Sequence, residues 1–280
     1  MFMPPYMRYL TYGILSLTVS FAGWKSIHNE RKYSISGVAK FDSLLLVVHD
    51  NKMMNQPRIS FLEKDMIKPI SWPLKELPYD LEGIYAMPEF PYQFLLMEST
   101  GKCYKIKLSR ELDKISVLNQ FILPDLKGGM NLEGLALFKS KNHLKIFYGD
   151  RGSDTRKSTL FVGDYNHEDD NISNVSSFEI DLPMPLKDKR NIGDLCFDNK
   201  NFLWSSATSD PGNDGPFSTY VYKIGRISES GYHPIPPEKG FTVNFDNQKV
   251  EAMTFEKGVL ILLTDNENFG SSRNNYRIYK

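Results

Sequence analysis

Residues 132–138 read Leu-Glu-Gly-Leu-Ala-Leu-Phe, and four other segments of the chain repeat this pattern. Each segment opens with an aliphatic residue, continues with an acidic or small pair and then becomes apolar. The five segments are residues 35–41, 81–87, 132–138, 192–197 and 250–255. They start roughly 45 to 60 residues apart, which suits four-stranded blades with loops of varying length. The sequence therefore predicts an all-β fold, a β-propeller of five four-stranded blades.

Further runs in each unit supply the remaining strands of a blade. A second apolar run follows each opening segment, and a third run alternates between apolar and polar residues, most clearly at 103–108, 220–224 and 276–280. The 15 Tyr and 18 Phe favour strands, because aromatic rings pack well on a pleated surface. A sixth, degraded blade within residues 155–190 remains an alternative.

The last unit stops on its third predicted strand, which leaves a sheet edge exposed. Residues 31–35, just before the first opening segment, could supply the missing strand and close the ring. We therefore expect an N-terminal strand to complete the last blade. The alternative is an open sandwich with coincidental similarity, and five ordered matches favour the propeller.

The first residues of the chain have the layout of a secretory signal. Arg8 precedes an uncharged run over residues 9–22 that ends Ser-Phe-Ala. A retained membrane anchor is the alternative, but this run is short for a membrane span. We expect a signal peptide over residues 1–22, a linker over 23–30 and a single propeller domain over 31–280. The protein would then be secreted or periplasmic, without a membrane span after cleavage.

Charge and motif content exclude several classes of function. The 34 basic and 34 acidic residues balance, so the molecule has no general attraction for nucleic acid or anionic lipid. Cys103 and Cys196 lie in non-neighbouring units, so a disulfide is not favoured, and no nearby His suggests a zinc site. No Gly-x-Ser-x-Gly elbow or Walker loop is present. We expect a monomer.

Repeated acidic residues predict a metal site at one end of the propeller. The first strand of a blade starts at the end where the antiparallel second strand finishes, so one face collects both sets of residues. Converging carboxylates repel unless a cation balances them, and oxygen donors without His or Cys favour calcium. The predicted metal ligands are Glu82, Glu133, Asp194, Glu251, Asp50 and Asp265. Alternatively, these acids accept backbone hydrogen bonds or pair with Arg and Lys at blade junctions.

Long polar loops on the same face supply candidate substrate contacts. The predicted substrate-binding residues are Arg58, Arg156, Arg273 and His49. We predict that Glu133 or Glu251 activates water and that Arg151 steadies developing negative charge, while calcium polarises the scissile group. The alternative is that the arginines neutralise neighbouring acids and that His49 is a hydrogen-bonded structural residue at a strand end.

The Leu-Glu-Gly openings at residues 81–84 and 132–135, with Asp265-Asn266 ending a strand, resemble the phytase-like or esterase-like propeller proteins of bacteria. The five-unit count is also similar to that of the calcium-activated apyrases, whose blades open with Ser-Gly or Glu-Gly elements. This resemblance implies a propeller, a divalent ion near the axis and, in some members, hydrolysis of phosphate esters. The chain departs from the pattern at Ser36, which replaces Glu, and at Gly193-Asp194, where the acid is shifted by one place.

Two functions from different classes are therefore expected. The first is an exported calcium-binding propeller that hydrolyses a phosphoester or similar small anionic substrate at the central channel. The second is a non-enzymatic propeller that binds a protein or glycan at the cell envelope through aromatic loops such as Pro216-Phe217 and Phe269. A lactonase-type metal propeller is a third option that differs mainly in substrate.

Overall fold

The structure, a computed structural model, describes residues 23–140 and 143–278 and consists of five antiparallel sheets. The predicted signal peptide, residues 1–22, lies outside the described residues. The first blade contains β2 (Gly37–Phe41), β3 (Leu44–Val48), β4 (Ile59–Glu63) and β5 (Met66–Ile70). The second contains β6 (Leu81–Ala86), β7 (Gln93–Glu98), β8 (Lys102–Leu108) and β9 (Ile115–Ile122). The third contains β10 (Leu132–Lys139), β11 (Leu144–Asp150), β12 (Ser158–Asn166) and β13 (Asn171–Ile180).

The fourth and fifth blades each depart from a simple four-strand meander. The fourth contains β14 (Lys189–Phe197), β15 (Phe202–Ser209), β16 (Ser218–Ser228) and β17 (Gly231–Pro234). The long strand β16 also pairs with β18 (Phe241–Asp246), and the short helix α1 (Pro237–Gly240) separates β17 from β18. The fifth contains β19 (Val250–Glu256), β20 (Val259–Thr264), β21 (Ser271–Arg277) and β1 (Lys25–His28). Two 3-10 turns complete the set, η1 (Arg31–Tyr33) and η2 (Glu267–Phe269).

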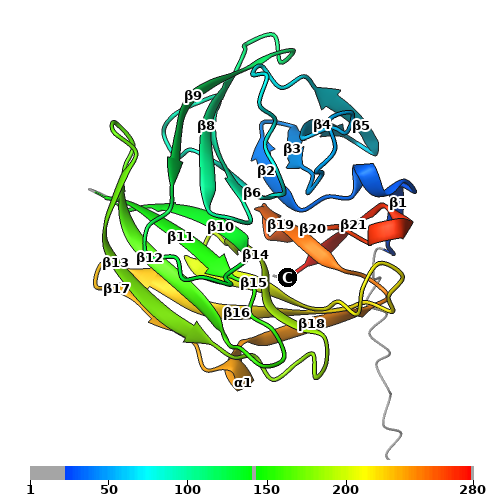
Figure 1. The fold of residues 1–280 in the computed structure, drawn as a ribbon. Helices are drawn as coiled ribbons and strands as arrows, with labels where there is room; N and C mark the ends of the chain where they lie inside the picture. The colour runs from blue at the N-terminus through cyan, green and yellow to red at the C-terminus, as the bar shows by residue number, and fades with distance from the viewer. Residues whose placement is uncertain (1–22, 141–142, 279–280) are drawn as a thin grey trace, which may run out of the picture.

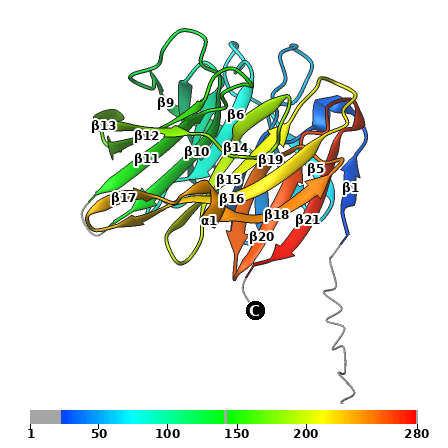
Figure 2. The ribbon, with the colours of Figure 1, turned by 90° about the horizontal axis from the view of Figure 1, so that it is seen from below.

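The five sheets form a ring around a common centre, which confirms the five-bladed propeller (Figure 1). The opening strand of each repeat is the innermost strand of its blade, and each inner strand contacts the inner strands of both neighbouring blades. The sixth blade left open over residues 155–190 is not formed, because β12 and β13 are the outer strands of the third blade. Figure 2 shows the ring from the side.

An N-terminal strand closes the ring, as predicted, but it comes from an earlier segment. Strand β1 pairs antiparallel with β21, with Lys25 opposite Arg273. The strand therefore falls in the stretch predicted as a linker and not at residues 31–35. Those residues instead turn through η1, and the backbone N–H of Ile35 donates to the carbonyl of Thr264. This turn carries the chain from the outer edge of the fifth blade to the inner strand of the first.

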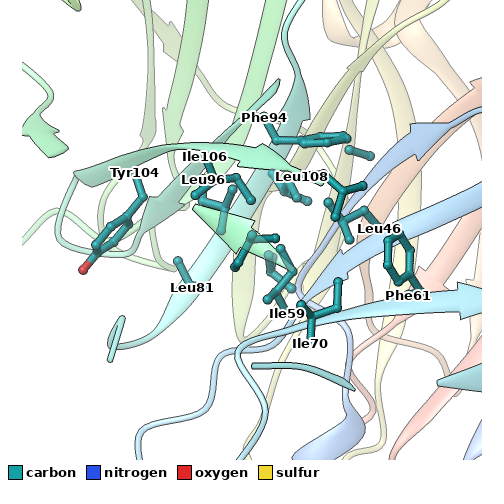
Figure 3. Packing of buried hydrophobic residues seen from close by; sticks show 14 residues of the cluster. Leu46, Ile59, Phe61, Ile70, Leu81, Phe94, Leu96, Tyr104, Ile106 and Leu108 are labelled. Carbon is teal, nitrogen blue, oxygen red and sulfur yellow. The ribbon is translucent and has the colours of Figure 1, made fainter. Parts of the chain in front are cut away.

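Five hydrophobic clusters fill the five interfaces between neighbouring blades, so each sheet buries both of its faces. Between the first and second blades, Leu46 and Phe61 pack against Phe94, Leu96 and Ile106 (Figure 3). Because the clusters follow one another around the ring, the inner strands are held in fixed positions about the axis. No helix among the described residues is long and apolar enough to cross a membrane.

The glycines of the repeat lie where neighbouring inner strands touch. A Cβ atom on Gly83 would lie 2.9 Å from Cβ of Leu135, and one on Gly134 would lie 2.5 Å from Cγ of Leu195. A Cβ on Gly37 would lie 3.1 Å from Cα of Gly83. The repeated Gly is therefore needed because the inner strands converge toward the axis, and a side chain there would push two blades apart.

We predict that Gly134→Ala lowers the free energy of unfolding by about 1–3 kcal/mol, because overpacking a filled interface forces the strands apart. Gly128→Ala is the matched control, since no heavy atom lies within 4 Å of the position its Cβ would take. Urea denaturation of both variants measures the difference. Equal stability of the two variants would contradict the steric role of the repeat glycine.

Candidate functional site

Three glutamates of the repeat occupy irregular positions on their inner strands. The β6–β7 pairing shifts register between Leu81 and Gly83, so Glu82 lies in a bulge. The same irregularity occurs at Glu133 in β10 and at Glu251 in β19. A bulge redirects a side chain out of the regular alternation of a strand. Ser36, the counterpart in the first blade, instead donates through Oγ to the carbonyl of Leu81, at 2.6 Å.

Arg190 joins two of these three glutamates, Glu133 and Glu251. Arg190 Nη1 lies 3.1 Å from Glu133 Oε1 and 3.4 Å from Glu251 Oε1. Arg190 Nη2 lies 2.5 Å from Asp210 Oδ2, and Arg151 Nη1 lies 3.0 Å from Glu133 Oε1. One guanidinium thus connects carboxylates from the third, fourth and fifth blades. These residues, with Asp50, Glu82, Lys249, Asp265 and Glu267, are called the axial site below.

Lys249 is the second internal cation of the axial site. Its side chain is only 2% exposed, and Nζ lies 3.1 Å from Asp210 Oδ2, 3.2 Å from Glu251 Oε1 and 2.6 Å from Glu267 Oε1. Burial alone would lower the pKa of Lys249, but neighbouring carboxylates, Glu251 foremost, hold it well above its ordinary value. The lysine is therefore charged, and three acids compensate it.

Both internal cations stabilise the ionised form of Asp210. Burial would raise the pKa of Asp210, but Lys249 and Arg190 outweigh it and lower that pKa below the ordinary value. Asp210 is therefore ionised and fixed between the two cations, where it completes their coordination by carboxylates.

Asp50 and Glu82 of the axial site are less well compensated, although Lys249 offsets part of the rise in the pKa of Asp50. Among the described residues, neither Asp50 nor Glu82 forms a side-chain ion pair or hydrogen bond. Burial, followed by the Asp265 carboxylate, raises the pKa of Asp50 to about 7. Burial, followed by the carboxylates of Glu133 and Glu251, raises the pKa of Glu82 well above its ordinary value. The second oxygen of Glu133, Oε2, is buried without a hydrogen-bond partner.

The fit of a metal ion depends on these unpartnered oxygens. As the side chains stand, no three His, Cys, Asp or Glu residues in the described ranges are grouped to hold an ion. Arg190 and Lys249 supply part of the positive charge, as the alternative to the metal hypothesis expected. Glu82, Asp50 and Glu133 Oε2 remain without a partner, and a donor set of oxygens alone suits a hard divalent ion.

Asp194, predicted as a metal ligand, does not face the axis. It occupies the position that Gly83 and Gly134 hold in their blades, so it points toward the next blade. Its carboxylate accepts from the backbone N–H of Leu195, at 2.7 Å, and from that of Met253. The prediction was wrong because the acid of the fourth unit is shifted by one residue along its strand. Successive side chains of a strand point to opposite sides, so Asp194 points to the junction with the next blade and not toward the channel.

His49 and Arg58, predicted to bind substrate, are buried structural residues. His49 is fully buried, its Nδ1 bonds to the carbonyl of Ser34 and its Nε2 to Ser60 Oγ. Burial lowers the pKa of His49 to about 4, so the ring is neutral at physiological pH. Arg58 is 4% exposed and donates to the carbonyls of Pro78, Gln56 and Met53. These contacts leave neither side chain available to a ligand.

The other predicted arginines have different surroundings. Arg156 pairs through both Nη groups with the buried carboxylate of Asp150, as the alternative expected. Arg273, on β21, donates to Asn275 and to the carbonyl of Lys64, and lies outside the axial site. Arg151 and Arg190 line a pocket of about 260 Å³ with Lys189 and Asp210. The axial site therefore has an open side lined by both basic and acidic groups.

Sequence reasoning missed the two internal cations and Asp210. An acid stands at the end of the second strand of every blade or within two residues after it, at Asp50, Glu98, Asp150, Asp210 and Asp265. That regularity would have found Asp210. Lys249 and Arg190 precede the repeated segments at different offsets, so no repeat position marks them.

Comparison with known proteins shows neither a family nor an activity for this chain. No protein-family model and no curated protein matches the chain. A chain of the "Crystal Structure of Mitotic Checkpoint Complex" is similar at 9% identity and a TM-score of 0.41, with 88% of this chain and 64% of that chain covered. A "Glycoside hydrolase" is similar at 11% identity and a TM-score of 0.48, with 89% and 61% covered. The chain thus spans less than two thirds of either structure, and at these values neither carries an argument about function.

Proposed function

We propose that the protein binds a divalent ion of the calcium type at the axial site and hydrolyses a small anionic ester beside it. The observation that supports this proposal is the charge imbalance at the axis. Neither Asp50 nor Glu82 forms an ion pair with a cation among the described residues, burial raises the pKa of both, and one oxygen of buried Glu133 has no hydrogen-bond partner. An internal excess of carboxylates is stable only if protons or a cation balance it.

Glu82 and the unpartnered oxygen of Glu133, from the second and third blades, would supply carboxylate ligands to the ion, because the Glu133 carboxylate lies near enough to Glu82 to raise its pKa beyond the effect of burial. When bound, a divalent cation would supply Lewis-acid polarisation of the scissile group. Asp50 is free of ion pairs and so is available to take a proton from water. By contrast, the Oε1 atoms of Glu133 and Glu251 are engaged by Arg190.

The pocket beside Arg151 and Arg190 is where an anionic group would lie. Both guanidinium groups are partly exposed, and the hydroxyls of Ser153 and Thr155 line the same pocket. Guanidinium groups bind phosphate and carboxylate with directed hydrogen bonds. Asp154 and Asp188 also line the pocket, so a singly or doubly charged small ester fits better than a polyanion.

We predict that calcium raises the melting temperature, because a ligand held only by the folded state stabilises it by about 2.7 kcal/mol at a hundredfold excess over Kd. Glu82→Gln should remove most of this shift. Glu76→Gln is the matched control, since Glu76 is an exposed glutamate paired with Lys102. Thermal melting in chelator and in calcium measures the shift for the three proteins.

Activity is tested separately by calcium-dependent release of phosphate from small monoesters such as p-nitrophenyl phosphate. A flat melting response to millimolar calcium would overturn the cation site. A calcium-dependent shift without product release from any ester would leave the ion site standing and overturn the hydrolase.

A further inference from the structure

A second pocket lies on the same face of the propeller, between the fourth and fifth blades. It has a volume of about 560 Å³, within the range of about 300–1,000 Å³ for small-molecule sites. Its walls come from the loops that precede β16, β19 and β21 and from the end of β1. None of the axial carboxylates lines it. We call it the loop pocket.

The loop pocket has a different chemistry from the axial site. Its lining carries four side-chain amides, those of Asn29, Asn247, Gln248 and Asn266, and no Lys, Arg or His. Asp214 is its only acid, and Ser26 and Ser272 add hydroxyls. Each amide offers both donors and an acceptor. A pocket without a basic group does not select an anion, whereas this array matches a neutral ligand with several hydroxyls.

An exposed aromatic ring stands at this pocket. Phe269 ends the turn η2, lines the pocket and is 59% exposed. The turn is held from both sides, because Asn268 Nδ2 donates to Asp214 Oδ1 at 2.9 Å and Phe269 N–H donates to the carbonyl of Asn266, at 2.9 Å. The ring is therefore presented to solvent by a fixed turn and is available to contact the apolar face of a ligand.

Part of the polar lining is fixed and part is left for a ligand. Asn266 Nδ2 donates to Gln248 Oε1 at 3.0 Å, and Asn266 Oδ1 accepts from the backbone N–H of Lys249 at 2.9 Å. These bonds leave the NH2 group of Gln248 and the second oxygen of Asp214 without a partner among the described residues. One donor and one acceptor therefore stand near Phe269 in fixed positions.

We propose that the loop pocket binds a neutral saccharide. Phe269 contacts the C–H face of a pyranose ring, and Asp214, Asn247 and Gln248 bond its hydroxyls. A pyranose combines one apolar face with hydroxyls around its rim, which matches one exposed ring beside a rim of amides. A nucleobase fits less well, because it has two flat faces and the other aromatic ring of the lining, Phe217, is buried.

Calorimetric titration in the presence of chelator tests this site without the axial ion. The probes are the neutral disaccharides cellobiose, maltose, lactose and chitobiose, with adenosine and uridine for comparison. We expect at least one disaccharide to bind with a Kd in the millimolar range or below. Phe269→Ala should weaken binding at least tenfold. Asn247→Gly removes an exposed side chain but allows the positive φ of 57° at this position, so it should weaken binding while the protein still folds. Phe241→Ala is the matched control, because Phe241 is 49% exposed in the fourth blade and lies outside the pocket.

The outcomes separate this proposal from the axial one. Binding that Glu82→Gln leaves unchanged and Phe269→Ala weakens supports the loop pocket, whatever the response to calcium. Failure of all four disaccharides to bind overturns it, as does binding of adenosine or uridine alone. Disaccharide binding that survives both Phe269→Ala and Asn247→Gly places the site elsewhere and also overturns it.

Discussion

Replacing Lys249 with methionine is expected to lower the free energy of unfolding by about 3–5 kcal/mol, because removal of one partner leaves buried charges uncompensated. Lys249 is 2% exposed and contacts Asp210, Glu251 and Glu267 within 3.2 Å. Methionine has nearly the same side-chain volume as lysine, so the loss of stability measures the removed charge and not the effect of a new cavity. Urea denaturation at about pH 8 measures it, since the acids are most ionised there.

Two comparisons isolate this electrostatic effect. Lys157→Met removes an exposed lysine paired with Glu179 and should cost less than about 1 kcal/mol. Adding Glu251→Gln to Lys249→Met should recover part of the lost stability, because it removes one of the buried acids that Lys249→Met leaves without a cation. Wild-type stability for Lys249→Met, or no recovery in the double variant, would show that the lysine does not balance the axial acids.

The blade count was predictable because the repeat has a steric cause. Glycine follows the axial residue in the first three units since the inner strands touch there, and Gly83 and Gly134 have no room for a Cβ. The closing strand was placed too late because Lys25–His28 is only four residues long. A pattern of that length does not distinguish a strand from a linker. Strand β18 was missed for a different reason: β16 is long enough to pair with two separate segments.

The axial site was only half predictable. Acids at fixed repeat positions were found, because Glu82, Glu133 and Glu251 each lie directly after the aliphatic residue that opens an inner strand. The cations that balance these acids, Arg190 and Lys249, were not found, because a cation needs only to lie near an acid in space and its position in the sequence need not repeat. Arg190, on the inner strand of the fourth blade, contacts Glu133 on that of the neighbouring third blade, 57 residues away along the chain. In the fourth blade Asp194 is shifted away from the axis, and Arg190 of the same strand takes part in the axial site.

We expect the stability of the calcium-free protein to fall as pH rises from about 4 to about 7. Asp50 has an ordinary pKa of 3.8 that burial and Asp265 raise to about 7 in the folded state. Between these values the folded protein holds a proton that the unfolded chain has released, so raising the pH favours unfolding. At about 1.4 kcal/mol for each tenfold change in acidity, Asp50 alone accounts for up to about 4 kcal/mol.

Asp50→Asn should therefore raise stability at about pH 8 and flatten the dependence of unfolding free energy on pH. Asp246→Asn is the control, because Asp246 is an exposed aspartate on β18 and should leave the curve unchanged. Urea denaturation in chelator across this range measures the three curves. If the curve of Asp50→Asn is parallel to that of the wild type, Asp50 is not the group that holds the proton in the folded state.

A bound divalent ion would replace such protons, so calcium should stabilise the wild type more at about pH 8 than at about pH 5. Stabilisation that is independent of pH would place the ion away from the acids that hold these protons.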